Sequence, residues 1–231
     1  MPPDTDYTWL MLRADAQRNR EAVIAAAREV FAELGLEAPL EEIARRAGVG
    51  IGTLYRRFPS RSDLADAILA STVESQVAAA EAALAIADPW DGFVYYLEET
   101  GRRQATDRGF NDMMSMRLPR VTKAEAAKKR MFELSEQIIA RAQASGQLRA
   151  DVTQEDLALL AWANTRIMQA TQEVSPQAWR RHLGLLLDGF RAERAHPLPV
   201  PPLTPRQVYR AMRSLGSRCT GQTESRPQVR A

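Results

Sequence analysis

The chain has 231 residues, of which 45% are hydrophobic and 26% are charged, a composition typical of a folded protein rather than a disordered one. Its 31 basic and 29 acidic residues leave a net charge of only +2, so any surface for nucleic acid has to be local. The single cysteine, Cys219, excludes an internal disulfide and a thiolate zinc site.

The N-terminal segment and the hydropathy of the chain predict a cytoplasmic protein. The first residues, "MPPDTDYTWLMLRADAQRNR", carry acids where a signal peptide carries lysines. No later segment reaches the ~20 unbroken apolar residues that a membrane helix needs. We expect no membrane partner, no cofactor and no bound metal.

The first helices are short and well delimited. Alanine, leucine, glutamate and arginine dominate the chain and alternating β-branched runs are almost absent, which predicts an all-α fold. A helix is expected over residues 15–34, ending at Gly35, and a short one between Pro39 and Gly48. A third follows from about Ile51 to Phe58. Ser60, with an acid three residues later, is a capping box that begins a fourth helix, near residues 61–86.

Longer helices and a proline-rich segment fill the rest of the chain. The helices are predicted near 89–106, 110–117, 121–145, 153–172 and 175–193. Five prolines between 197 and 205 predict an extended strap. These elements suggest a disordered segment at 1–14, a helix-turn-helix domain at 15–66, a helical ligand-binding and dimerisation domain at 67–195, and a proline-rich tail at 196–231.

The stretch "AGVGIGTLYRRF" joins the second and third helices in the manner of a helix-turn-helix. Two short helices separated by a three- or four-residue turn with glycine are the signature of this DNA-binding motif. Val49, Leu54 and Phe58 supply a buried edge for the second of them. The remaining positions of that helix are then available to reach DNA.

The charge pattern around this motif favours DNA contact. Between Ile43 and Ser62 there are five arginines and no acid, which is a one-sided window in a chain with nearly balanced charge. Such a window predicts a phosphate-binding surface. The alternative is that the arginines only solvate a short helical hairpin.

The segment "APLEEIARRAGVGIGTLYRRFPSRSDLADAIL" resembles the helix-turn-helix of the TetR (TetR/AcrR-type) family of bacterial transcriptional regulators. The match runs from about Ala22 to Ile68, while the later helices resemble the family only in kind. The resemblance implies two domains: an N-terminal helix-turn-helix domain that binds DNA and a larger C-terminal helical domain that binds a ligand and dimerises.

The resemblance also implies a set of DNA-binding residues. Gly50 takes the place of a serine cap on the recognition helix, and a core role is the alternative for Tyr55. Arg18 and Arg20 are weaker candidates for phosphate contacts. The predicted DNA-binding residues are Leu40, Gly50, Ile51, Gly52, Thr53, Tyr55, Arg56, Arg57 and Arg61.

The last two long helices, residues 153–172 and 175–193, suit a homodimer interface. "QEDLALLAWANTRIMQAT" is too apolar for a helix that faces only solvent, and "PQAWRRHLGLLLDGFRA" has a wide apolar stripe. Two such neighbouring helices can pair with their copies as a four-helix seam. The alternative is that they pack only the core of one subunit.

The larger domain is expected to hold a small, apolar or amphipathic effector. Aromatic and methionine side chains can line an adaptable cavity, although core packing is the alternative for each of them. Arg166 needs a partner on an apolar helix, either an effector carboxylate or an internal acid. The predicted ligand-binding residues are Trp90, Phe93, Tyr96, Phe110, Met113, Met114, Trp162, Arg166 and Met168.

No set of residues in the sequence suggests an enzyme. His182 and His196 stand alone, and the glycines at 48, 50 and 52 lie between helices rather than after a strand. We therefore predict a homodimeric transcriptional repressor that an effector releases from a palindromic operator on double-stranded DNA. The alternatives are a regulator controlled by assembly or by a partner protein, and a helical-bundle enzyme or carrier.

Overall fold

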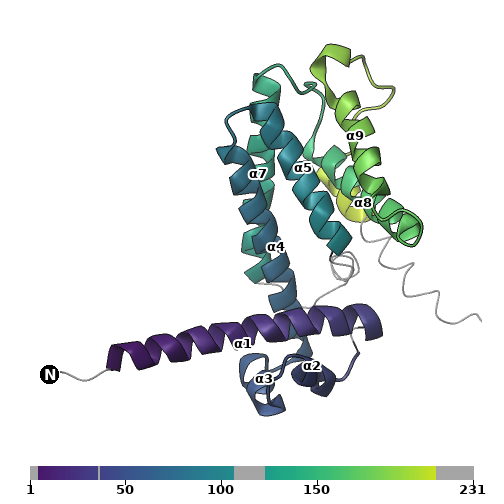
Figure 1. Ribbon diagram of the computed structural model, residues 1–231. Helices are drawn as coiled ribbons and strands as arrows, with labels where there is room; N and C mark the ends of the chain where they lie inside the picture. Colours follow the sequence, from purple (N-terminus) through teal and green to yellow (C-terminus); the bar gives the residue numbers. More distant parts are fainter. Residues whose placement is uncertain (1–4, 36, 107–122, 212–231) are drawn as a thin grey trace, which may run out of the picture. The chain divides into compact units, whose positions relative to one another are not determined.

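A computed structural model describes residues 5–35, 37–106 and 123–211 (Figure 1). Every regular element in these ranges is a helix, which confirms the all-α fold. Contacts divide the chain into two units. The N-terminal unit is residues 1–72 with 118–125, and the C-terminal unit is residues 73–117 with 126–231.

The N-terminal unit consists of α1 (Thr5–Leu34), α2 (Leu40–Arg46), α3 (Ile51–Arg57) and the first half of α4 (Arg61–Ala85). Residues 5–14, expected to be disordered, are helical and form the beginning of α1. The core of this unit comes from all four helices. Its most buried members include Val23, Ala27, Val30, Ile43, Leu54 and Leu64.

Local sequence signals fix the ends of these helices. Gly35 and Gly48 follow α1 and α2 with φ of 79° and 66°, a left-handed conformation that favours glycine. At the start of α4 the Asp63 carboxylate accepts from the Ser60 N–H at 3.0 Å, and the Ser60 hydroxyl accepts from the Asp63 N–H at 3.1 Å. This confirms the predicted capping box.

The C-terminal unit contains the second half of α4, α5 (Pro89–Thr106), α7 (Lys123–Ala144), α8 (Gln154–Thr171), α9 (Ala178–Phe190) and a 3-10 turn at Ala192–Arg194. In Figure 1, α5 lies between the pair α4 and α7 and the pair α8 and α9. Residues 196–204 have no regular structure, and 205–211 are helical. The helix predicted at 110–117 and the segment 212–231 lie outside the described residues.

Two buried or half-buried arginines join the helices of this unit. Arg141 donates to the carbonyl oxygens of residues 84, 86 and 87 at 2.7–2.8 Å, one in the last turn of α4 and two in the segment directly after it. Arg149, only 7% exposed, forks onto Asp151 at 2.6 and 2.9 Å. It also donates to the His196 carbonyl at 2.8 Å, which fixes the start of the proline-rich segment.

None of the helices in the described ranges is both long and apolar enough to cross a membrane.

Candidate DNA-binding surface

The helices α2 and α3 form a helix-turn-helix. The turn spans residues 47–50, where the N–H of Val49 donates to the carbonyl of Ala44 at 3.0 Å. Gly50 is the N-cap of α3 and provides no side-chain cap, so the helix begins with the N–H groups of Thr53 and Leu54 on the Gly50 carbonyl. Leu54 is fully buried and Phe58 is 5% exposed, which confirms them as the anchors of α3.

The opposite side of α3 is open. Ile51 is 37% and Tyr55 46% exposed, so the Tyr55 ring is not a core residue. Gly52, Arg56 and Arg57 are exposed as well. A recognition helix needs this combination of one buried edge and one exposed face.

The side chains on this face differ in whether they already form hydrogen bonds within the protein. The Arg56 guanidinium donates to the Thr53 hydroxyl at 3.0 Å, one turn earlier on the same face. Arg57 makes no hydrogen bond or ion pair with any residue in the described ranges. Arg57 is therefore the cation of α3 that is most available to DNA.

Two arginines of the predicted phosphate-binding window are paired with acids from outside it. Arg45 forks onto Glu42 with N–O distances of 2.7 and 2.8 Å. Arg46 forks onto Glu33 of α1 at 2.6 and 2.8 Å and also donates to Glu42 at 2.8 Å. The hydrogen bonds from Arg45 and Arg46 lower the pKa of Glu42 to about 2, so this carboxylate is ionised at neutral pH.

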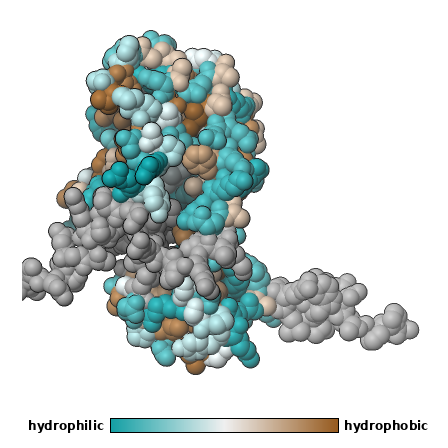
Figure 2. All heavy atoms as spheres, turned by 180° about the vertical axis from the view of Figure 1, so that it is seen from behind, coloured by the Kyte–Doolittle hydropathy of each residue, from teal (hydrophilic) through white to brown (hydrophobic). Residues whose placement is uncertain are grey.

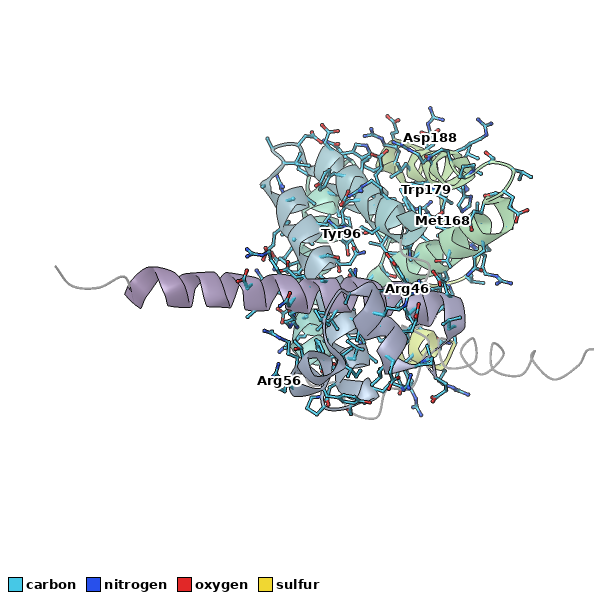
Figure 3. The ribbon with its side chains drawn as sticks, turned by 60° about the horizontal axis from the view of Figure 1, so that its bottom comes forward. Arg46, Arg56, Tyr96, Met168, Trp179 and Asp188 are labelled. Atoms are coloured by element: carbon cyan, nitrogen blue, oxygen red, sulfur yellow. The ribbon has the colours of Figure 1, made fainter. Side chains whose placement is uncertain are left out.

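Three other candidates have internal roles. Leu40 was predicted to contact DNA, but its side chain is 7% exposed and belongs to the core. Arg61 is half-buried and donates to the Ala38 carbonyl. Arg18 pairs with Asp15 on the surface of α1. Figure 3 shows Arg46 and Arg56 on different parts of the helix-turn-helix.

Comparisons with known proteins agree with this geometry. Residues 23–68 match the sequence family described as bacterial regulatory proteins, tetR family. Residues 88–192 match the C-terminal domain of SbtR-like transcriptional regulators. A TetR transcription regulatory protein from Mycobacterium vanbaalenii is 33% identical, with a TM-score of 0.56 over 78% of this chain and 99% of its own. The chain belongs to the TetR family.

Two further relatives are consistent with this assignment. A TetR transcriptional regulator from Streptomyces coelicolor is 30% identical, with a TM-score of 0.54 over 74% of this chain and 98% of its own. An HTH-type transcriptional regulator of Staphylococcus aureus is 43% identical over 54 residues, which are 23% of this chain and 29% of that protein. This TetR-family protein is a DNA-binding transcriptional regulator and not an enzyme.

The predicted effector-binding residues that the structure describes do not gather around one pocket. Trp90, Phe93 and Tyr96 are buried in the core of the C-terminal unit. The Trp90 ring stacks under Arg191 at 3.8 Å, and burial raises the pKa of Tyr96, whose hydroxyl bonds with Ser135. Core packing accounts for these three side chains.

The other effector candidates have varied positions. Trp162 and Met168 are half-buried, and Met168 packs against the core. Arg166 is exposed and donates to Gln169 at 3.0 Å, rather than to an acid. Phe110, Met113 and Met114 lie outside the described residues. A shallow groove of about 550 Å³ is lined by none of the described candidates, but by Phe132, Glu136, Ile139, Ala140, Gln143, Thr153, Gln154, Glu155 and Pro205.

Sequence reasoning assigned no role to two buried amides, Gln104 on α5 and Asn164 on α8. Asn164 is completely buried, and neither its oxygen nor its nitrogen has a hydrogen-bond partner among the residues that the structure describes. Gln104, 7% exposed, donates weakly to the Ala161 carbonyl at 3.4 Å, while its own oxygen has no partner. The sequence did contain a signal for Asn164. It lies one turn after Leu160 and two turns after Leu157, so a polar residue occupies the apolar stripe of α8.

Proposed function

We propose that this TetR-family protein is a homodimeric repressor that binds a palindromic operator and leaves it when a small molecule binds to the C-terminal unit. Each α3 enters the major groove of one half-site. The exposed face of α3, opposite the buried Leu54, is the observation that carries this proposal.

The proposed DNA contacts come from that face. Thr53, Tyr55, Arg56 and Arg57 supply hydrogen-bond donors for phosphates and base edges, and Ile51 supplies an apolar contact. Gly50 and Gly52 allow the backbone to come close. Arg61 has part of its donor capacity committed to Ala38, so it contributes less than the arginines of α3.

Dimerisation is proposed through α8 and α9. Leu159 of α8 is 40% exposed and Leu185 of α9 is 62% exposed, although both are large and apolar. Figure 2 shows hydrophobic side chains that reach the surface of the C-terminal unit among hydrophilic ones. Two copies of this helix pair would cover these leucines in an isologous interface.

A neutral, polar effector is supported by the buried amides of Asn164 and Gln104. A buried amide without a partner costs free energy, so such groups recur where a ligand supplies the missing hydrogen bonds. No charged group would be needed to hold a carbonyl or hydroxyl between them. We propose that an effector inserts between α5 and α8 at this point and shifts the population of conformations that fit the operator.

Arg57→Ala tests the DNA-binding surface. Selection from a random duplex library gives the operator, and we expect half-site centres about 10–10.5 base pairs or a multiple apart. If Arg57 contacts a phosphate, the variant binds all sequences more weakly and the slope of log K against log salt falls by about 0.9. If it reads a base, the loss is about 1–3 kcal/mol and is confined to the selected sequence.

Arg206→Ala is the matched control, because Arg206 is exposed and lies outside the helix-turn-helix unit. The two variants have the same net charge. Equal affinities for Arg57→Ala and Arg206→Ala would show that α3 does not provide the proposed contact.

A further inference from the structure

Glu42 pairs with two arginines, Arg45 and Arg46, which differ in how many other contacts fix their side chains. Arg46 uses three donors internally, two on Glu33 and one on Glu42, and its side chain is 26% exposed. It therefore connects α1 to α2. Arg45 has no acidic partner other than Glu42 in the described ranges, and its side chain is 70% exposed.

The fork between Arg45 and Glu42 uses the donors that would bind DNA. A guanidinium fits a carboxylate and a phosphate with the same planar pair of N–H groups, so the two anions compete for it. An exposed pair of this kind is weak in water, and a DNA phosphate can displace the carboxylate. Arg45 lies in the last turn of the supporting helix, and such a helix crosses the DNA backbone.

We infer that Glu42 limits the DNA affinity of this surface through Arg45, by occupying its guanidinium until a DNA phosphate takes its place. The inference rests on the proposed DNA-binding surface. A complex in which a phosphate replaces Glu42 first has to break the pair between Arg45 and Glu42, so the carboxylate weakens binding by up to the free energy of that pair. In the operator complex, base contacts hold the protein in one register and the exchange from Glu42 to phosphate is favoured.

Glu42→Gln tests this role against Glu41→Gln. Glu41 is the adjacent acid in the first turn of α2, is exposed, and makes no hydrogen bond or ion pair with any residue that the structure describes. Both variants add one positive charge and remove the same helix-dipole interaction. Only Glu42→Gln frees Arg45, while the fork between Arg46 and Glu33 still holds α2 to α1.

The readout is binding to the selected operator and to a scrambled duplex of about 30 base pairs, which spans two half-sites one turn apart. Relative to Glu41→Gln, we expect Glu42→Gln to bind the scrambled duplex up to about fivefold more tightly at 0.1 M salt, because the gain cannot exceed the cost of breaking an exposed ion pair. The slope of log K against log salt becomes steeper by about 0.9. Operator affinity rises by at least the same factor, because the exchange is favoured in that complex.

Arg45→Ala in the Glu42→Gln background completes the test, and we expect it to abolish the gain on the scrambled duplex. Equal changes in Glu42→Gln and Glu41→Gln, or a gain that persists without Arg45, would overturn the inference. Arg57→Ala is measured alongside. If Arg57→Ala weakens binding while the glutamate variants are equal, only the role of Glu42 is wrong; if Arg57→Ala also has no effect, the proposed surface is wrong. Thermal melting confirms that each variant is folded.

Discussion

Gly52 lies on the exposed face of α3, where a methyl group would meet no atom of the protein within 4 Å. Its backbone is not in the left-handed region, so the conformation of α3 does not require glycine. The fold therefore gives no reason for glycine at this position. Close approach of the α3 backbone to DNA does give one.

Gly52→Ala should separate stability from DNA binding. Alanine is the better helix former, and we expect the free energy of unfolding to rise by up to about 1 kcal/mol. If DNA approaches at this point, operator affinity falls by at least about tenfold, which corresponds to about 1.4 kcal/mol. Thermal melting and operator titration measure the two effects. A variant that is more stable and binds as well as the parent would show that DNA does not pack against Gly52.

Asn164, in the C-terminal unit, is another residue that the fold does not explain. Its amide is fully buried and unpaired, so the unliganded protein bears the desolvation cost. Asn164→Leu replaces the amide with an apolar group of similar size. We expect a gain of about 1–3 kcal/mol in stability, and loss of the response to any effector that the parent protein binds.

Thr165→Val provides the control for Asn164→Leu. The Thr165 side chain is also buried, but its hydroxyl donates to the Ala161 carbonyl at 3.0 Å, so its removal should stabilise nothing. Melting temperatures of the two variants, with and without candidate neutral compounds, give the comparison. A lower melting temperature for Asn164→Leu would mean that its amide already contributes to the fold.

At the scale of the elements, the helices of the motif were predictable because their signals are local. Pro39, Gly48 and the Ser60–Asp63 box lie within a few residues of the ends they determine. The beginning of α1 was not predicted. Asp4, directly before Thr5, is a residue type that favours a helix start, but "MPPDTDYTWL" combines prolines with mixed polarity and shows no apolar stripe at helical spacing.

The arginine window shows why the site was predicted less well than the fold. The window in which the charges were counted, residues 43–62, begins one residue after Glu42, and Glu42 pairs with both Arg45 and Arg46. Glu33, thirteen residues away from Arg46, reaches it only because α1 and α2 pack together. Side-chain pairing between helices cannot be seen in a linear window. Of the five candidate cations, Arg46 is tied to α1, Arg45 is held by Glu42 in the free protein, Arg61 is partly engaged, and the two on α3 have no acidic partner in the described ranges.

The effector-binding residues were hard to predict for a related physical reason. An aromatic residue at a helical spacing serves equally well to fill a core or to line a cavity, and sequence patterns do not distinguish the two. Phe93 fills the core, with its ring edge-on to Phe190 at 6.1 Å between centroids. An unpaired amide is more informative than an aromatic ring, because packing alone cannot satisfy it.

At the scale of the whole molecule, operator binding by this fold requires two recognition helices held together. One α3 covers one half-site, and linking two heads raises affinity for the full operator by about 10²–10⁴ without any new contact. We propose that the two subunits are linked through the surface of α8 and α9 on which Leu159 and Leu185 are exposed in the single chain. Breaking that link should reduce affinity for the full operator but leave half-site binding intact.

Leu185→Glu is expected to produce a monomer. Because Leu185 is 62% exposed, the charge meets solvent in the single chain and the fold is preserved, whereas in a dimer it would be buried against a copy of the same helix pair without a partner. Val174→Glu is the control, since Val174 is 82% exposed and follows α8 rather than lying on either helix. Sedimentation measures the mass, and titration compares full operator with half-site. If Leu185→Glu remains a dimer and binds the full operator like Val174→Glu, the two subunits meet through another surface.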